Sequence, residues 1–282
     1  MITSVGNQRV KRIAQWNKKP SLRNRDGVFV AEGVKMFLEA PLGSLKEIYI
    51  ADGFLEEIGK AERSRDILGK LEECGYETVS KEVFSKMSDT CSPQGILFVA
   101  GQIHYTLEQM AGAAENPLFL LLEDIQDPGN LGTMIRTGEG AGISGVIMSK
   151  GTADIYNPKT IRSTMGSVYR VPFLYAEDFH GTICRLQENG ITVYAAHLKG
   201  EKCYDEFEYC RPTAFLIGNE GSGLTEETAE LADVYVRIPM EGQLESLNAA
   251  VASALLVYEA AGRRRRGAVE SNTPPQEAGH QT

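Results

Sequence analysis

Three segments of the chain share one pattern, in which an apolar, strand-like run ends in a polar loop that leads into a helix. The three runs are 118–123, 214–217 and 234–238. The polar and charged residues that lie in the loops or early in the helices are Asn130, Arg136, Glu220, Ser246 and Asn248. The first backbone N–H groups of a helix have no partner within it, so the loop before a helix can hold a ligand. We therefore expect the three loops to form one composite site.

The rest of the chain also alternates between short apolar runs and helical patterns, which favours an α/β fold. In the N-terminal part we expect strands at 28–31, 45–51, 76–80 and 95–100, and helices at 1–19, 33–40, 54–74 with a break near Ala61, and 81–88. In the C-terminal part we expect strands at 118–123, 144–149, 191–196, 213–217 and 233–238, and helices at 131–141, 158–166, 179–189, 225–231 and 247–262. The first helix is amphipathic, because Val10, Ile13 and Trp16 recur on one face.

This alternation divides the chain into two domains, which its length of 282 residues allows. Residues 1–102 are predicted to form a small α/β sandwich, and residues 103–116 a linker. Residues 117–264 are predicted to form the second α/β domain. Residues 265–282 are rich in Pro, Gly, Gln, Ser and Thr, which predicts a disordered tail.

The composition is that of an ordinary globular protein, with 42% hydrophobic and 24% charged residues. No apolar run reaches the 18 or so residues of a membrane span, and the N-terminus has no apolar signal-peptide core. The cysteines are scattered and odd in number, and no two have the spacing of zinc ligands. We therefore expect a protein of the reducing cytoplasm, without a metal and without a membrane partner.

Charge is distributed unevenly along the chain. The formal net charge is −9, but residues 1–25 carry +7 and no acid, so the remainder carries −16. A basic segment on an acidic body can bind phosphates locally. The residues predicted to bind RNA are Arg9, Lys11, Arg12, Lys18, Lys19 and Arg23. The alternative for this segment is a solvated helix face, and a second basic run, 263–266, is either an RNA contact or a helix end that interacts with the helix dipole.

Glycine-rich stretches exclude two common nucleotide-binding motifs. The loop 218–223 precedes a helix but lacks the Gly-Lys-Ser/Thr sequence of a nucleoside triphosphate site. The stretch 137–142 lies at the end of a predicted helix and not at its start, so it is typical of helix termination and not of a dinucleotide site. A nicotinamide-dependent enzyme is therefore disfavoured.

Three motifs carry a resemblance to a known family. They are Asn130-x-Gly-x-x-x-Arg136, Ile217-Gly-Asn-Glu220-Gly-x-Gly-Leu224 and Ile238-Pro-Met-x-Gly-x-x-x-Ser-Leu-Asn248. In this order, each after a predicted strand, they closely resemble the SpoU (TrmH-type) family of RNA ribose 2′-O-methyltransferases, of the SPOUT class. The resemblance covers about residues 116–262, and residues 1–100 are similar to the accessory RNA-binding domain of the family.

The resemblance implies a C-terminal SPOUT domain with a deep trefoil knot, a homodimer formed through its first and last helices, and S-adenosyl-L-methionine as cofactor. The residues that would bind the cofactor are Gly218, Ile238, Leu247, His197 and Met240. The residues that would act in catalysis are Arg136, Asn130, Glu220, Ser246 and Asn248. A guanidinium stays protonated in proteins, so we interpret Arg136 as a stabiliser of negative charge on the ribose oxygen and not as the base.

Each of these assignments has a plainer alternative. Arg136 could pair with Glu139 or Glu220 in a structural ion pair, and Ser246 and Asn248 could only cap a helix. His197 could be structural. For the whole chain we expect methyl transfer to a ribose 2′-hydroxyl of structured RNA, with ribosomal RNA favoured over transfer RNA by family analogy. The other alternative is a non-catalytic RNA-binding or ribosome-assembly protein with the same fold.

Overall fold

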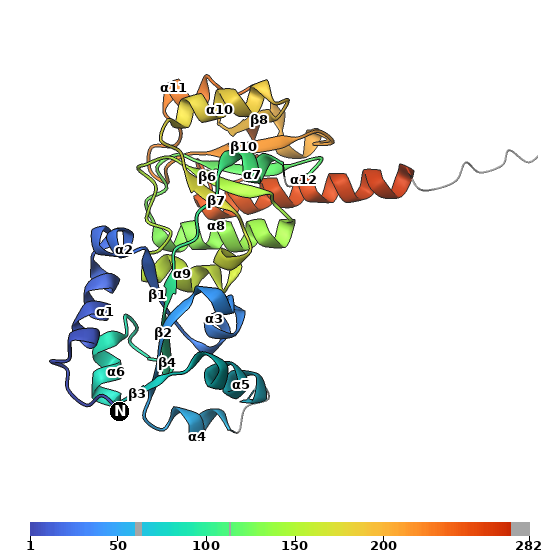
Figure 1. Ribbon diagram of the computed structural model, residues 1–282. Coiled ribbons are helices and arrows are strands. Elements are labelled where there is room, and N and C mark those ends of the chain that lie inside the picture. Colours follow the sequence, from blue (N-terminus) through green and yellow to red (C-terminus); the bar gives the residue numbers. More distant parts are fainter. Residues whose placement is uncertain (60–63, 113, 272–282) are drawn as a thin grey trace, which may run out of the picture. The chain divides into compact units, whose positions relative to one another are not determined.

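The computed structural model describes residues 1–59, 64–112 and 114–271 (Figure 1). The chain forms two compact units. The first unit comprises residues 1–105, 125–136 and 152–172. The second unit comprises residues 106–124, 137–151 and the chain from Phe173 onward. Each unit is described below by itself.

A mixed four-stranded sheet forms the centre of the first unit. Its strands are β1 (Val28–Glu32), β2 (Leu45–Ala51), β3 (Glu77–Val79) and β4 (Ile96–Gly101). Their order is β1-β4-β2-β3, and β4 pairs antiparallel with both β1 and β2, whereas β2 and β3 are parallel. All five residues of β1 are buried, so both faces of this sheet are covered.

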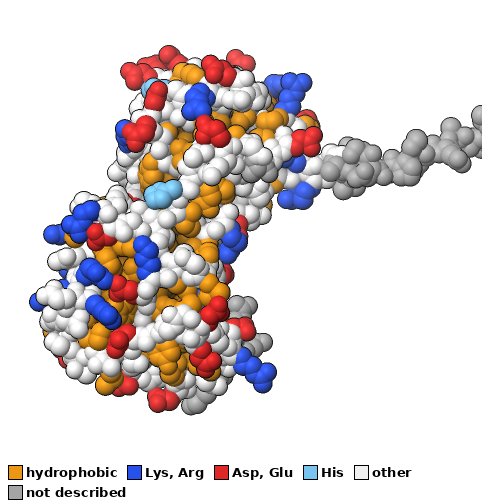
Figure 2. Space-filling model, viewed as in Figure 1, with side chains coloured by type: hydrophobic (Ala, Val, Ile, Leu, Met, Phe, Trp, Pro, Cys, Tyr) orange, Lys and Arg blue, Asp and Glu red, His pale blue; other side chains and the backbone are white. Residues whose placement is uncertain are grey.

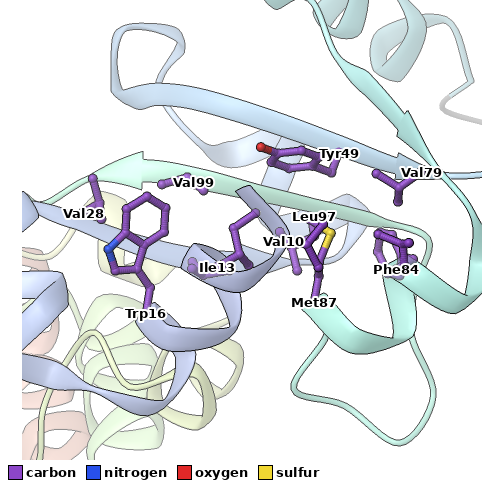
Figure 3. Close-up of a cluster of buried hydrophobic side chains, with 12 residues drawn as sticks. Val10, Ile13, Trp16, Val28, Tyr49, Val79, Phe84, Met87, Leu97 and Val99 are labelled. Carbon is purple, nitrogen blue, oxygen red and sulfur yellow. The ribbon is translucent and has the colours of Figure 1, made fainter. Parts of the chain in front are cut away.

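Helices cover both faces of this sheet. Figure 1 shows α1 (Gln8–Lys18) and α6 (Lys81–Met87) on one side, and α3 (Val34–Glu39) and α5 (Ser64–Cys74) on the other. The predicted stripe of Val10, Ile13 and Trp16 packs on the sheet together with residues of α6 (Figure 3). The remaining helices of residues 1–105 are α2 (Pro20–Asp26), η1 (Leu42–Ser44) and α4 (Phe54–Ile58). The predicted sandwich is therefore confirmed in its layers.

Two later segments of the chain, 125–136 and 152–172, also belong to this first unit. They carry the first turns of α8 (Pro128–Ala141), the helix α9 (Pro158–Thr164) and the short η2 (Ser167–Tyr169). Helix α9 packs against β1. Tyr156 stacks on Phe29 with ring centroids 5.0 Å apart, and its hydroxyl donates to the carbonyl of Ile103 at 2.7 Å. Side chains of the sheet therefore hold the segment 152–172 in place.

The second unit contains a seven-stranded sheet. Its strands are β5 (Leu118–Leu122), β6 (Gly145–Met148), β7 (Phe173–Tyr175), β8 (Thr192–Ala196), β9 (Lys202–Cys203), β10 (Thr213–Ile217) and β11 (Val234–Arg237). Their order is β7-β6-β5-β10-β8-β11-β9, and all the pairs are parallel. Every residue of β5 and β10 is buried, as expected for central strands of a parallel sheet with helices on both faces.

The helices of the second unit are α7 (Leu107–Ala111), the end of α8, α10 (Phe179–Glu188), η3 (Tyr204–Glu206), α11 (Glu226–Ala229) and α12 (Ala249–Ser271). Figure 1 shows α10 and α12 on opposite sides of the sheet. Helix α10 packs on β8, and α12 packs on β10. The predicted α/β fold with a parallel sheet is confirmed.

The structure differs from the sequence predictions in several elements. Helix α2 replaces a predicted loop, and the short strands β7 and β9 were not predicted. Helix α7 lies within the predicted linker. Helix α12 continues to Ser271, although the sequence predicts a disordered tail from residue 265. The rest of that tail, 272–282, and the break near Ala61 lie outside the described residues.

Among the described residues, none of the helices is both long and apolar enough to cross a membrane. Likewise, the described part of the chain holds no group of three or more His, Cys, Asp and Glu side chains that could bind a metal ion.

Candidate active site

In the first unit, Asp127 fixes the start of helix α8. One of its carboxylate oxygens accepts the N–H of Asn130 at 2.9 Å, and the other accepts the Lys159 ammonium at 2.7 Å. These bonds, with that of Lys159 first, hold the pKa of Asp127 below its usual range. Pro128 occupies the first helical position, where a missing N–H costs nothing. The capped turn places Asn130 at the beginning of the helix.

Helix α8 lies unusually close to α9. A side chain at Gly132 would place its Cβ 2.5 Å from the Cβ of Ser163 and 2.6 Å from the carbonyl oxygen of Thr160. Only glycine therefore allows this approach. One turn further on, Arg136 is exposed. Its guanidinium is therefore accessible from solvent.

In the second unit, the other predicted site residues follow β8, β10 and β11. Because these three strands are parallel, their carboxyl ends meet at one edge of the sheet. His197 follows β8, the segment 218–224 follows β10, and the segment 238–248 follows β11. The sheet therefore brings these three loops to a common edge, where α/β proteins bind ligands.

The loop after β10 is held by its own backbone and by the side chain of Asn219. A Cβ at Gly218 would collide with the backbone of Gly223 and Leu224. Asn219 exchanges two backbone hydrogen bonds with Gly223, at 3.0 and 2.9 Å. Its side-chain oxygen accepts the N–H of Gly221 at 2.8 Å, and its side-chain nitrogen donates to the Asp124 carbonyl at 2.8 Å. Asn219, which is not among the predicted site residues, is thus the anchor of this loop.

A buried carboxylate holds the chain just beyond this loop. Glu123 is 7% exposed. It accepts the backbone N–H of Thr225 at 2.9 Å, the hydroxyl of Thr225 at 2.8 Å and the hydroxyl of Thr228. His180 Nε2 lies 2.7 Å from the same Thr228 hydroxyl. Each polar group of this cluster therefore has a partner, as burial requires.

The loop after β11 combines apolar and polar residues. Ile238, Met240 and Leu247 are half-buried, whereas Ser246 is exposed. Asn248 caps helix α12, because its side-chain oxygen accepts the N–H of Ala250 at 2.9 Å. The plainer role predicted for Asn248 is therefore present, whatever its role in catalysis.

His197 lies against the neighbouring strand. Its backbone N–H donates to the Val236 carbonyl at 3.0 Å, and its ring lies on that of Tyr235 with centroids 4.9 Å apart. Nδ1 accepts the N–H of Lys199 at 3.1 Å. Burial, and then the charge of Lys199, lower the pKa of His197, so the neutral imidazole is favoured at neutral pH.

These residues fit S-adenosyl-L-methionine, the cofactor implied by the resemblance. The half-buried Ile238, Met240 and Leu247 offer apolar surface for a flat adenine ring. The tight turn at Gly218 leaves mainly backbone groups to line its loop. Backbone donors and acceptors suit the neutral adenosine part of the cofactor.

The basic N-terminal segment forms a groove on the first unit. The groove has a volume of about 370 Å³, and the residues that line it are Gln8, Arg9, Lys11, Arg12, Gln15, Trp16, Leu22, Arg25 and Asp26. Figure 2 shows Lys and Arg side chains gathered over α1 and α2. The Arg12 guanidinium lies 4.7 Å from the centre of the Trp16 ring. Arg25 was not among the predicted RNA-binding residues, since only the fold brings α2 beside α1.

One predicted RNA-binding residue is wrong. Arg23 is only 1% exposed. Its guanidinium donates to the carbonyls of Trp16 and Asn17 and pairs with Asp154. The amphipathic turn of α2 points this side chain inward, where it cannot reach RNA. Lys18 and Lys19 are exposed at the junction of α1 and α2.

The second basic run divides into two pairs. Arg264 donates to the carbonyls of Tyr209, Asn116 and Arg211, at 3.0, 2.7 and 2.8 Å. Burial lowers its pKa. Arg263 pairs with Glu208 at 3.2 Å and donates to the carbonyl of Asp205. These first two arginines therefore fasten α12 to the second unit, whereas the last two of the run are exposed.

Comparison with known proteins identifies the family. The SpoU rRNA Methylase family matches residues 117–258, and the MRM3-like substrate binding domain matches residues 7–98. The first match covers half of the chain, so the protein belongs to the SpoU rRNA methylase family. The predicted enzyme class, a cofactor-dependent RNA 2′-O-methyltransferase, and its cofactor, S-adenosyl-L-methionine, are confirmed at the level of this family.

Relatives and solved structures are similar over nearly the whole chain. The 23S rRNA (guanosine(2553)-2′-O)-methyltransferase RlmP of Bacillus subtilis is 35% identical over 93% of this chain and 99% of its own. The AdoMet-bound rRNA methyltransferase from Sinorhizobium meliloti is 30% identical, with a TM-score of 0.78 over 94% of this chain and 97% of its own. The SpoU methyltransferase AviRb from Streptomyces viridochromogenes is 26% identical, with a TM-score of 0.79 over 93% and 99%.

Proposed function

We propose that this protein transfers the methyl group of S-adenosyl-L-methionine to a ribose 2′-hydroxyl of 23S ribosomal RNA. The observation that carries the proposal is the capped helix α8, which holds Asn130 half-buried and Arg136 exposed in the unit that also has the basic groove. The similarity to RlmP over nearly the full length of both chains supports the choice of RNA. Recognition of a 2′-hydroxyl also selects RNA over DNA.

The cofactor supplies an electrophilic methyl group on a positively charged sulfur. With the cofactor bound, O2′ would take this methyl group as the sulfur–carbon bond breaks, and the hydroxyl proton would leave to a substrate phosphate or to water. Arg136 stabilises the negative charge that develops on O2′ and binds the adjacent phosphate. Asn130 and Glu220 orient the acceptor and Arg136, and Ser246 and Asn248 bind ribose or phosphate. Positioning of the two reactants supplies much of the rate.

In this proposal the cofactor side consists of Gly218, Ile238, Leu247, His197 and Met240. Gly218 and the half-buried apolar residues bind the adenosine part. In a neutral His197 whose Nδ1 accepts from Lys199, Nε2 carries the proton and can donate a hydrogen bond, and the ring adds no positive charge beside the sulfonium. The lowered pKa of His197 supports this role.

In this proposal the RNA binds in the basic groove of α1 and α2. Its cations are Arg9, Lys11, Arg12 and Arg25, with Lys18 and Lys19 nearby in the sequence. Phosphate contacts of this kind position the RNA and do not read its sequence. The match of residues 7–98 to a substrate binding domain supports this assignment.

The protein also acts as a homodimer in the cytoplasm in this proposal, with a knotted domain at 117–264 after the linker 103–116. Helix α12 supports the dimer, because Val251 and Tyr258 are 48% and 47% exposed and lie two turns apart on one face. Large apolar side chains in such a row are typical of a contact surface.

The test is methyl transfer by the purified protein from labelled S-adenosyl-L-methionine to ribosomal RNA that lacks the modification. Digestion to nucleosides should return the label on a 2′-O-methylnucleoside. Label on a base would contradict the proposal. Methyl transfer only to transfer RNA would show that the substrate is transfer RNA and not ribosomal RNA. Cofactor binding without methyl transfer to any RNA would favour the non-catalytic alternative.

A further inference from the structure

The basic groove and the first turns of α8 belong to the same compact unit, although about 100 residues separate them in sequence. A continuous series of contacts joins them. It begins at Arg23, the buried arginine that the sequence assigned to RNA. Its guanidinium donates to the carbonyls of Trp16 and Asn17 in the last turn of α1, and it pairs with Asp154. Arg23 therefore connects the helix of the groove to the loop before α9.

Asp154 continues the connection into α9. The second oxygen of its carboxylate accepts the N–H of Tyr156 at 2.8 Å. Its backbone carbonyl accepts the N–H of Asn157 and the hydroxyl of Thr160, both at 3.0 Å. Asn157 caps α9. Asp154 therefore sets both the position and the start of this helix.

Helix α9 in turn holds the start of α8. Lys159 donates to Asp127, which caps α8, at 2.7 Å. Gly132 of α8 lies against Thr160 and Ser163, with no room for a side chain. A shift of α9 must therefore move the turn of α8 that carries Asn130, and with it Arg136 one turn later.

We propose that Arg23 and Asp154 are positioning residues, which keep RNA bound in the basic groove in register with Arg136. The distance from groove to acceptor helix then selects which ribose is methylated. This inference rests on the proposed function. The guanidinium of Arg23 is buried and the carboxylate of Asp154 is half-buried. Removing one of them would leave the other charge buried without its ion-pair partner, which is costly. This cost keeps the connection rigid.

The first test needs no catalysis. Arg23→Lys keeps the positive charge, but an ammonium group cannot replace the planar guanidinium that donates to two carbonyls and a carboxylate. Amide hydrogen exchange at Asn130 and Leu131, whose N–H groups bond to Asp127, should speed up about tenfold in Arg23→Lys and in Asp154→Asn. The matched control is Arg264→Lys, a half-buried arginine that donates to carbonyls of the second unit. It should leave those amides unchanged.

The second test measures turnover and site choice. At saturating RNA and cofactor, Arg23→Lys and Asp154→Asn should lower kcat about tenfold, with RNA and cofactor affinities within twofold of wild type. Mapping at nucleotide resolution should find methyl groups on riboses beside the wild-type position. Arg264→Lys should keep the wild-type position.

Three results would overturn the inference. One is unchanged exchange in α8 in both folded variants, and another is wild-type kcat with wild-type site choice. The third is loss of RNA affinity in proportion to activity, which would make Arg23 a direct RNA contact. If wild-type protein methylates no RNA, the proposed function fails, and the exchange experiment still decides whether Arg23 couples the two helices.

Discussion

The two units fix their candidate site residues by different means. In the first unit side chains do it, since Asp127, Lys159, Asp154 and Arg23 hold α8 and α9 through charged hydrogen bonds. In the second unit uncharged groups shape the loop after β10, since Gly218 packs against the backbone of Gly223 and Leu224, and Asn219 bonds through both its main chain and its amide side chain. The first arrangement suits an acceptor whose charge must be met, and the second suits a neutral adenosine. Single substitutions in the first unit should therefore change methyl transfer without changing cofactor affinity, and substitutions in the loop after β10 should change cofactor affinity without changing RNA affinity.

The largest effect is expected at the acceptor side. Arg136→Ala should lower kcat by about 10²–10³-fold, the usual loss when one donor to a developing oxyanion is removed. Arg136→Lys should also be slow, because a point charge does not replace a planar fork. Cofactor affinity should stay within twofold. Single-turnover transfer and calorimetry measure the two quantities, and a fast Arg136→Ala enzyme would remove this residue from the mechanism.

The next effect is expected on RNA affinity. Changing Arg9, Lys11, Arg12 and Arg25 to Gln should lower the log–log salt slope by roughly 3–4 and affinity near physiological salt by about 10²-fold. Cofactor affinity should not change.

A matched variant controls for net charge. It changes the exposed Lys35, Lys46, Arg65 and Lys81, which lie outside the groove, to Gln. Binding measured over a salt series compares the two proteins. Equal loss in both would mean that the groove is not the RNA site.

A smaller effect is expected on the cofactor side. Gly218→Ala forces the loop away from Gly223 and Leu224. Overpacking costs about 1–3 kcal/mol, which corresponds to roughly 10–100-fold weaker cofactor binding if the loop itself shifts. RNA affinity and its salt slope should stay at wild-type values. Gly142→Ala, at a helix end in the same unit, controls for stability, and unchanged cofactor affinity in Gly218→Ala would exclude this loop from the cofactor site.

The smallest effect is expected at Asp127. Its pKa is lowered mainly by the hydrogen bond from Lys159. A carboxyl whose pKa is lowered by folding stabilises the folded protein when the pH is above its pKa in the unfolded chain, which is about 4. This stability is lost as the pH falls through the lowered pKa. Asp127→Asn keeps the helix cap, and the pair is 54% and 45% exposed, so its contribution at pH 7 should be under about 1 kcal/mol. Unfolding by urea at pH 7 and near pH 3 measures it, and a pH-independent difference would contradict the ion pair.

Most of the fold could be predicted from local patterns. The apolar runs of β5 and β10 predict their strands to within one residue. The stripe of Val10, Ile13 and Trp16 predicts helix α1, but the helix begins at Gln8 and not at residue 1. The sequence does not predict helix α2, because Pro20 and a run of polar residues are typical of a loop, although Gly27 caps the end of the helix. Strands β7 and β9 are too short for a periodic signal.

The site could be predicted only as residue types on loops. The family resemblance proposes Asn130, Arg136 and Glu220 as site residues, but it assigns nothing to Asn219 or Glu123, whose roles in the loop depend on long-range hydrogen bonds. Arg23 was misassigned because a basic run does not reveal which side chain turns inward. Its partner Asp154 is 131 residues away in the sequence, and no local pattern connects the two.

The most direct test of the account is a map of ribose methylation on ribosomal RNA from cells without this protein, complemented by the wild type or by Arg136→Ala. The account predicts that one ribose of 23S RNA loses its methyl group, regains it with the wild type and does not regain it with Arg136→Ala. An unchanged map in the cells that lack the protein would contradict the account, and so would full restoration by Arg136→Ala.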